Sequence, residues 1–212
     1  MTAAPELTDL TIAADPVAWA AAGFHVEDGE VTVGAVRIAF AHEGRRITGW
    51  SLHGLGDHDL DGLPTARSPE PPGDEAPAHP NGIDRIDHVV AFTPDMDRTV
   101  AALEAAGLDL RRRREGPTSA GSRRQAFFRV GRPILETIEH PPDTKAAADV
   151  RAPARFWGLA FGTADLDACV AALGPLIGEP RDAIQEGRRI ATLRQEAGLG
   201  LPVAVMSEKV SP

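Results

Sequence analysis

A histidine and a glutamate, each inside a short apolar stretch typical of a strand, are the residues of this sequence best suited to chemistry. His88 lies in the stretch 86–92, and Glu136 lies in the stretch 134–138. If the two strands curve around one cavity, the neutral imidazole nitrogen and the anionic oxygen can face the same space and bind a divalent ion. Two ligands are fewer than the roughly three that a catalytic metal site takes from the protein.

Two other interpretations of this pair stay open. Glu136 can orient or polarise the imidazole for metal-free acid–base chemistry, because a histidine changes its charge near neutral pH. His88 can also be a cleft-lining or hydrogen-bonded core residue that takes part in no reaction.

Further acids and histidines are weaker candidates for the same site. Glu139 and His140 follow Glu136 on the same strand, but they adjoin a Pro-Pro pair and are expected to face solvent. His25 and His42 belong to the N-terminal region. They reach the cavity only if that region folds over it.

Arginines and aromatic residues supply candidates for substrate binding. Four consecutive arginines, 111–114, lie in a predicted strand, so alternate side chains point to opposite faces and two of the four can meet an anionic ligand. The alternative is a solvated outer strand. Arg124 and Arg189 are candidates to orient a substrate carboxylate, although an arginine recurs at this point of each repeat, which favours a structural role. Phe127 and Trp157 can contact an organic ligand or belong to the core.

Composition narrows the classes of partner. The chain has 212 residues and a formal net charge of −9, which repels a phosphate backbone, so no nucleic-acid partner is expected. Cys169 is the only cysteine and excludes an internal disulfide. The first residues lack the basic start and apolar run of a signal peptide, and no stretch approaches the ~20 apolar residues of a membrane span. We expect a cytoplasmic protein that does not enter a membrane.

The elements that must position these residues follow a repeat. In the middle of the chain, the strand 86–92 is followed by Thr93-Pro94, which suits a helix N-cap and first turn. An apolar stripe with helical spacing comes next and ends at Gly107. The same layout returns seventy positions later, with the strand 156–161, a cap at Thr163 and a second apolar stripe before a glycine.

The repeat divides the chain into three modules. We expect a degenerate N-terminal module at 1–53, a proline-rich linker at 54–82, a central module at 83–142 and a C-terminal module at 150–208. After each helix comes a tetrapeptide that begins with arginine, at Arg37, Arg124 and Arg189, which we interpret as the same strand of three repeats. The closing strands are expected at 47–52, 133–138 and 202–206.

Each module therefore consists of a strand, a helix and three more strands, and the fold class is α+β. One four-stranded sheet with one helix leaves an apolar face uncovered, so we expect βαβββ modules to pair into a curved mixed-sheet cradle with helices outside. The inward side chains then line a cavity for a small molecule. Three modules is an odd number, which makes a homodimer one way to pair the third.

The sequence resembles the glyoxalase, bleomycin resistance and extradiol dioxygenase proteins of the vicinal oxygen chelate superfamily. The resemblance rests on Ile86-Asp-His-Val-Val with Thr93-Pro-Asp-Met-Asp, on Ile134-Leu-Glu-Thr-Ile, and on Trp157-Gly-Leu-Ala-Phe with Asp165-Leu-Asp, and it covers about residues 84–207. It implies paired βαβββ modules around a cleft. In metal-using members the ligands come from the first and last strands of both modules.

The resemblance implies a metal half-site and two functions. His88 and Glu136 match the ligand positions of the central module, whereas Gly158 and Ala204 stand where the C-terminal module would supply its two ligands. One function is a lyase, isomerase or dioxygenase that acts on a small organic molecule with a divalent ion such as Zn, Fe, Mn or Ni. The other is a metal-free binding or drug-sequestering protein of the bleomycin-resistance type.

Overall fold

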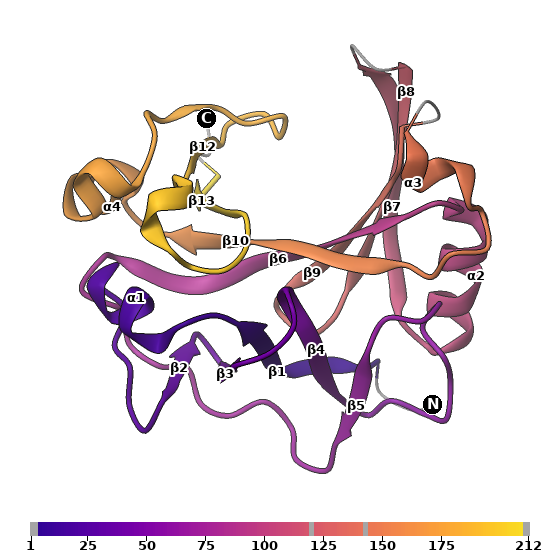
Figure 1. Ribbon diagram of the computed structural model, residues 1–212, viewed down its shortest axis with the longest axis horizontal. Helices are drawn as coiled ribbons and strands as arrows, with labels where there is room; N and C mark the ends of the chain where they lie inside the picture. Colours follow the sequence, from indigo (N-terminus) through magenta and orange to yellow (C-terminus); the bar gives the residue numbers. More distant parts are fainter. Residues whose placement is uncertain (1–3, 119–120, 142–143, 210–212) are drawn as a thin grey trace.

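The computed structural model describes residues 4–118, 121–141 and 144–209 and shows an α+β fold with two mixed sheets (Figure 1). The first sheet has five strands in the order β2-β3-β1-β4-β5. These strands are β1 (Glu6–Ala13), β2 (Glu30–Val33), β3 (Val36–Ala41), β4 (Arg46–His53) and β5 (Thr65–Ser68). A short helix, α1 (Pro16–Ala21), follows β1.

The second sheet has eight strands in the order β11-β12-β13-β10-β6-β9-β8-β7. The strands are β6 (Ile83–Thr93), β7 (Asp109–Thr118), β8 (Gly121–Arg129), β9 (Ile134–Glu139), β10 (Arg155–Thr163), β11 (Arg181–Asp182), β12 (Arg189–Thr192) and β13 (Val203–Ser207). The helices are α2 (Met96–Ala105), α3 (Lys145–Ala148) and α4 (Leu166–Leu173).

The eight-stranded sheet is a pair of βαβββ modules, as the sequence predicts. In each module the first strand pairs in parallel with the last, β6 with β9 and β10 with β13, and the remaining strands follow outward. The modules meet where β6 and β10 pair antiparallel. In Figure 1, β8 and the β12–β13 strands rise on the same side of β6 and β10, so the sheet forms the predicted cradle.

Helices α2 and α4 begin at equivalent residues. The N-cap is Asp95 for α2 and Asp165 for α4, because each carboxylate accepts a hydrogen bond from the backbone N–H three residues later. The prediction of a threonine cap was wrong by two residues. Thr93 and Thr163 instead accept a hydrogen bond from the N–H of the aspartate, which fixes the turn before the helix. Gly107 follows α2 with the positive φ of 86° that a glycine adopts readily.

The five-stranded sheet covers the outer face of the central strands, between α2 and α4 (Figure 1). The N-terminal region contacts β10 through aromatic rings of helix α1, the turn after it and β4. Trp19 and Phe24 lie 6.1 and 5.5 Å from Phe161 between ring centroids, and Trp50 lies 5.1 Å from Phe156. These rings are buried and join both sheets in one hydrophobic core.

The strand order of the five-stranded sheet repeats part of the eight-stranded sheet. Strands β2-β3-β1-β4-β5 have the same relative directions as β12-β13-β10-β6-β9. The strand β3 that carries Arg37 therefore corresponds to the closing strands β9 and β13. The interpretation that equated Arg37 with Arg124 and Arg189 was wrong, because those two residues lie on the preceding strands β8 and β12.

The proline-rich segment 54–82 takes part in the fold. It supplies β5, which pairs in parallel with β4, and its Leu60 and Leu63 are buried. The Asp61 carboxylate accepts hydrogen bonds from the Arg98 guanidinium of α2, at 2.6 Å from Nε, and from the Thr99 hydroxyl. This segment therefore holds the N-terminal sheet against α2.

The predicted end of the central module, residue 142, lies outside the described residues. The predicted homodimer stays a prediction. Within the part of the chain that the structure describes, no helix is long and apolar enough to cross a membrane.

The ring of Phe161 is fully buried where the two sheets meet, which predicts a large loss of stability on truncation. We expect Phe161→Ala to lower the free energy of unfolding by about 3 to 5 kcal/mol, because a buried aromatic side chain leaves a cavity. Urea unfolding followed by tryptophan fluorescence measures the change. Phe127→Ala, at a partly exposed ring of β8, is the control and should cost clearly less. Equal losses in the two variants would contradict a core that spans both sheets.

Candidate functional site

A cleft opens on the inner side of the eight-stranded sheet and is lined by both modules. It consists of two adjoining cavities of about 160 and 200 Å³. Four residues line both cavities, namely His88, Arg114, Phe127 and Gln185. The wall from the central module adds Gln125 and Glu136, and the opposite wall consists of β12, β13 and the β11–β12 turn. The cleft has the size of a site for a small organic molecule or part of a larger one.

The structure brings His88 and Glu136 together in this cleft. They lie on neighbouring parallel strands, where Glu136 is in register with Val90, two residues beyond His88. The His88 Nε2 lies 3.3 Å from Glu136 Oε2, and the side chains are only 16% and 12% exposed. The other Glu136 oxygen accepts a hydrogen bond from Gln125 Nε2 at 2.5 Å. Both members of the pair are therefore fixed by contacts on neighbouring strands.

A β-bulge brings a second carboxylate to the same imidazole. Between β6 and β10, Ile86 pairs with Phe161 and His88 with Ala160, so Asp87 is an extra residue on β6. In a regular strand Asp87 and His88 would face opposite sides. Here the Asp87 carboxylate lies 2.9 Å from His88 Nδ1, so that the imidazole stands between two carboxylates.

An arginine from the other module fixes Asp87. Arg188 donates to Asp87 Oδ2, to the backbone oxygen of Ser207 at 2.8 Å and to Gln185 Oε1 at 2.8 Å. Burial tends to raise the pKa of Asp87, but hydrogen bonds from His88 and Arg188 outweigh it and lower this pKa to about 2. Asp87 is therefore ionised at neutral pH and favours the tautomer of His88 that carries a proton on Nδ1.

The arginine run of β7 divides between the two faces of the sheet, as predicted. Arg112 and Arg114 line the cleft. Arg113 points the other way, with its guanidinium 3.6 Å from Asp97 Oδ1 of α2, and Arg111 pairs with Asp109. Among the described residues, no carboxylate pairs with Arg112 or Arg114, so both guanidinium groups are available to an anion in the cleft.

Of the other residues predicted to contact a substrate, only one lies in the cleft. Arg124 donates to Asp97 of α2 at 2.6 Å, and Arg189 donates to the equivalent Asp167 of α4 at 2.8 Å, both on the helix side of the sheet. This placement favours the structural role that their repetition indicated. Trp157 lies at the far end of β10 from the Asp87 bulge and is 37% exposed, with the Arg46 guanidinium 3.9 Å from its ring centroid. Phe127 lines the cleft.

The weaker candidates lie elsewhere. Glu139 accepts hydrogen bonds from Arg124 and from the Met96 N–H, and His140 stacks on Phe92 with ring centroids 5.0 Å apart. His25 pairs with Glu27 in the N-terminal sheet, which covers the outer face, so that sheet does not fold over the cleft.

The residues present do not fit a catalytic metal site. A Cβ on Gly158 would lie 2.4 Å from the backbone oxygen of Pro202, so this position cannot carry a ligand without a backbone shift. Ala204 is the counterpart of Glu136, because it pairs with Ala160 of β10 as Glu136 pairs with the equivalent Val90 of β6. An alanine side chain has no atom that can bind a metal. Across residues 4–118, 121–141 and 144–209, no three His, Cys, Asp or Glu side chains form a group that could hold a metal ion.

Sequence reasoning missed the contacts that orient His88. Asp87 adjoins His88 in the sequence, but the regular strand periodicity assigns it to the other face. Arg188 lies 101 residues away from Asp87 and has no local signal. Gln125, which directly precedes the alanine and two phenylalanines of β8, could have been found, because it shares the inward face with Phe127.

Among known proteins, the chain is similar to several solved structures. No family model and no curated protein matches the chain. The paired βαβββ modules and their strand order are the fold that the resemblance to the vicinal oxygen chelate superfamily implies. Among solved structures, methylmalonyl-CoA epimerase from Mycobacterium tuberculosis is similar at 16% identity, with a TM-score of 0.49 over 65% of this chain and 93% of that chain.

Two further solved structures show the same degree of similarity. A variant of methylmalonyl-CoA epimerase from Streptomyces coelicolor, in complex with 2-nitronate-propionyl-CoA, is 24% identical, with a TM-score of 0.47 over 60% of this chain and 99% of that chain. A hypothetical protein from Bacillus halodurans is 16% identical, with a TM-score of 0.48 over 60% of this chain and 96% of that chain.

The lowered pKa of Asp87 predicts how stability depends on pH. Because this pKa is lower in the folded state than the ordinary value of 3.8, the ionised carboxylate stabilises the fold above about pH 4, and the contribution is lost as the pH falls toward 2. We expect Asp87→Asn to be less stable by roughly 2 kcal/mol near pH 6, with a gap that narrows near pH 2.5. Urea unfolding at both pH values measures the gap. Asp97→Asn, at an exposed ion pair, is the control with little effect. A constant gap for Asp87→Asn would contradict the prediction.

Proposed function

We propose that the protein binds a small organic anion in the cleft and moves a proton on it, with His88 as the acid–base residue and without a divalent metal. The observation that carries this proposal is the chain of contacts Asp87–His88–Glu136, with distances of 2.9 and 3.3 Å, in a cleft whose Arg112 and Arg114 pair with no carboxylate of the described residues. The reaction class is a proton transfer at carbon, as in an isomerase or lyase.

The two carboxylates give the imidazole its role. Asp87 accepts a hydrogen bond from the Nδ1–H of His88, so the lone pair of the imidazole is on Nε2, in the cleft beside Glu136. When Nε2 takes a proton from a substrate C–H bond, the bonding electron pair stays on the substrate as an enolate-like anion. The imidazolium that forms lies between two anionic groups, which stabilises it, and it returns the proton to the same or a neighbouring carbon.

The arginines of β7 give the cleft its preference for anions. Arg112 and Arg114 present two guanidinium groups on the wall next to His88, and Arg181 adds a third charge from the opposite module. A substrate carboxylate bound to Arg114 would be held by charge-assisted hydrogen bonds. The same positive charge would stabilise the negative charge that develops when a neighbouring carbon loses its proton.

A second candidate function is metal-free binding without turnover. It is favoured by one observation, the replacement of both ligand positions of the C-terminal module by Gly158 and Ala204, which leaves the site without the donor set of the metal-using enzymes. A binding protein needs the arginines and the apolar wall of the cleft. It does not need the ordered contacts on both nitrogens of His88, which is why we rank it second.

Proton transfer can be tested before the substrate is known. We expect the wild-type protein to catalyse exchange of the C3 protons of a short 2-oxocarboxylate in deuterium oxide, followed by NMR, and His88→Gln to reduce the rate by about 100-fold or more. Gln retains hydrogen bonding but cannot act as a base. His140→Gln, at a histidine outside the cleft, is the matched control and should retain the rate. Exchange that is absent in the wild type across a panel of such acids would favour the binding protein.

Metal analysis distinguishes the proposed metal-free reaction from a metal-dependent one. Protein purified without a His tag should contain less than a stoichiometric divalent metal, and its exchange rate should survive dialysis against EDTA. A tightly bound ion that is lost in both His88→Gln and Glu136→Gln would instead support the metal site that the superfamily resemblance implies.

Arg114 lines the cleft and Arg113 lies on the opposite face of the sheet, so the two arginines should differ in their effect on ligand binding. We expect Arg114→Gln to weaken the binding of a short carboxylate by about tenfold, because a hydrogen bond to a charged group contributes about 1.5 kcal/mol or more. Arg113→Gln should leave binding unchanged, since Arg113 lies on the helix side. Isothermal titration calorimetry measures both, and a larger effect of the Arg113 change would show that the anion binds elsewhere.

A further inference from the structure

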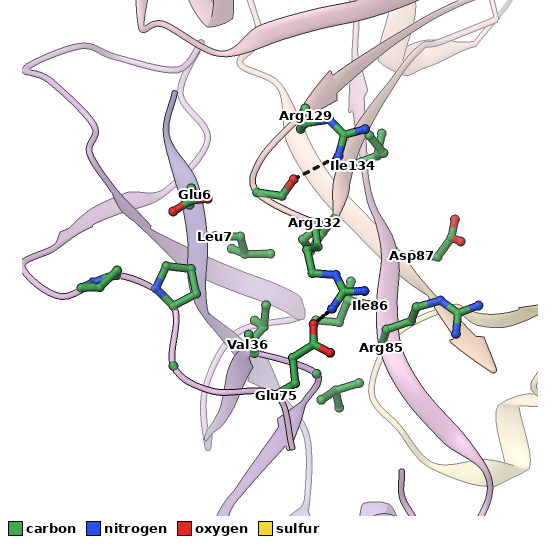
Figure 2. Close-up of a pocket in the computed structure, with 18 of the residues that line it drawn as sticks. Glu6, Leu7, Val36, Glu75, Arg85, Ile86, Asp87, Arg129, Arg132 and Ile134 are labelled. Carbon is green, nitrogen blue, oxygen red and sulfur yellow. Dashed lines mark hydrogen bonds and ion pairs between the residues drawn. The ribbon is translucent and has the colours of Figure 1, made fainter. Parts of the chain in front are cut away.

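A second, larger cavity lies where the N-terminal sheet meets the start of β6. Its volume is about 570 Å³, and it is lined by the start of β1, the β2–β3 turn, residues 71–75, the start of β6 and the β8–β9 turn (Figure 2). The β2–β3 turn is seated on β6, with the Cβ position of Gly34 only 3.5 Å from the Asp84 backbone oxygen. The N-terminal sheet therefore forms one wall of this cavity and the eight-stranded sheet the other.

This cavity adjoins the cleft that contains His88. Three residues line both spaces, namely Asp87, Ile134 and Gln185. Strand register gives the geometry of the connection, because His88 pairs with Ile134, and Ile134 pairs with Arg129. Neighbouring strands lie about 4.8 Å apart, so Arg129 stands roughly 10 Å from His88 across the sheet.

The lining of the second cavity combines apolar and charged side chains, and one of its arginines has no ion pair within the part of the chain that the structure describes. Leu7, Val36, Ile86 and Ile134 supply apolar surface. Of the cationic groups, Arg132 forms an ion pair with Glu75, as the dashed line in Figure 2 marks, and Arg188 is paired with Asp87.

Two further arginines line this cavity. Arg85 pairs with Asp84 at 2.5 Å. Arg129 contacts only the backbone oxygen of Gly131, at 3.4 Å, within the described part of the chain (Figure 2). Its guanidinium can therefore bind an anionic group without breaking an existing ion pair.

We propose that this cavity is a second compartment of the His88 cleft and that the ligand is an elongated organic anion with a negative group at each end. The reacting end binds at His88 and Arg114, the apolar chain crosses Ile134, and the distal anionic group binds Arg129. The inference rests on the proposed function for the reacting end. The N-terminal sheet then contributes to specificity, because it forms one wall of the compartment and so limits the length of ligand that fits.

Chain length is the quantity that tests this assignment. The probes are straight-chain monocarboxylates and α,ω-dicarboxylates of about four to ten carbons, titrated into the full-length protein by calorimetry. We expect affinity to rise with chain length and each long dicarboxylate to bind about tenfold more tightly than the monocarboxylate of the same length, because it gains a hydrogen bond to a charged group.

Two substitutions, each with a matched control, test whether the second cavity and Arg129 cause the higher affinity of the long probes. Ala35→Trp fills the second cavity from the β2–β3 turn, whereas Thr32→Trp introduces the same side chain on the same hairpin at an exposed site outside it. We expect only Ala35→Trp to abolish the gain for long probes. Arg129→Gln should remove only the tenfold preference for dicarboxylates, and Arg111→Gln, at an exposed ion pair of the same sheet, should retain it.

The outcomes separate this inference from the proposed function. Short monocarboxylates report on the reacting end alone, so their binding should depend on Arg114 and be unaffected by Ala35→Trp. If short probes bind and affinity does not rise with length, or if Ala35→Trp leaves the gain intact, the second compartment is overturned and the proposed function stands. If long probes gain affinity but no probe depends on Arg114, the assignment of the reacting end is overturned. Absence of binding by every probe would overturn both.

Discussion

The extra residue Asp87 in β6 is the constraint on which the arrangement of the cleft depends. The bulge at Asp87 turns two consecutive side chains to the same region, so that one imidazole meets a carboxylate on each ring nitrogen. An unpaired buried carboxylate would be costly, and the Arg188 guanidinium from the other module offsets that cost. The bulge therefore couples the orientation of His88 to the packing of the two modules against each other.

The two modules keep the same scaffold but carry different chemistry. Equivalent arginines of β8 and β12 pair with the equivalent aspartates Asp97 and Asp167 of the helices, which shows that these contacts serve the module itself. The inner face differs. Where the central module presents a histidine and a glutamate, the C-terminal module has Gly158 and Ala204, and the Pro202 backbone occupies the space next to the glycine. The histidine and the glutamate therefore lie on one wall of the cleft, and the other wall presents Ile190 and Met206 together with Arg181.

Much of the fold could be predicted from the sequence, because its signals are periodic and local. The helical stripes, the glycines after them and the apolar strands of the central and C-terminal modules place the elements correctly. The bulge could not be predicted, since Asp87 fits a regular strand equally well. Arg188 could not be placed either, because its partner is distant in the sequence. The strand of Arg37 was misassigned because the N-terminal module lacks a strand that the other two have, and four similar letters concealed the difference.

The N-terminal sheet covers apolar surface that the two paired modules leave exposed. Helices α2 and α4 cover the flanks of the eight-stranded sheet, but the outer face of β6 and β10 between them is apolar and would be exposed. A reduced copy of the same strand arrangement, with one short helix, covers this face with Trp19, Trp50 and Phe24. Because this copy also reaches the start of β6, the packing that completes the core is the packing that closes the cavity beside Asp87. Stability and the shape of the ligand site are therefore set by the same contact between the sheets.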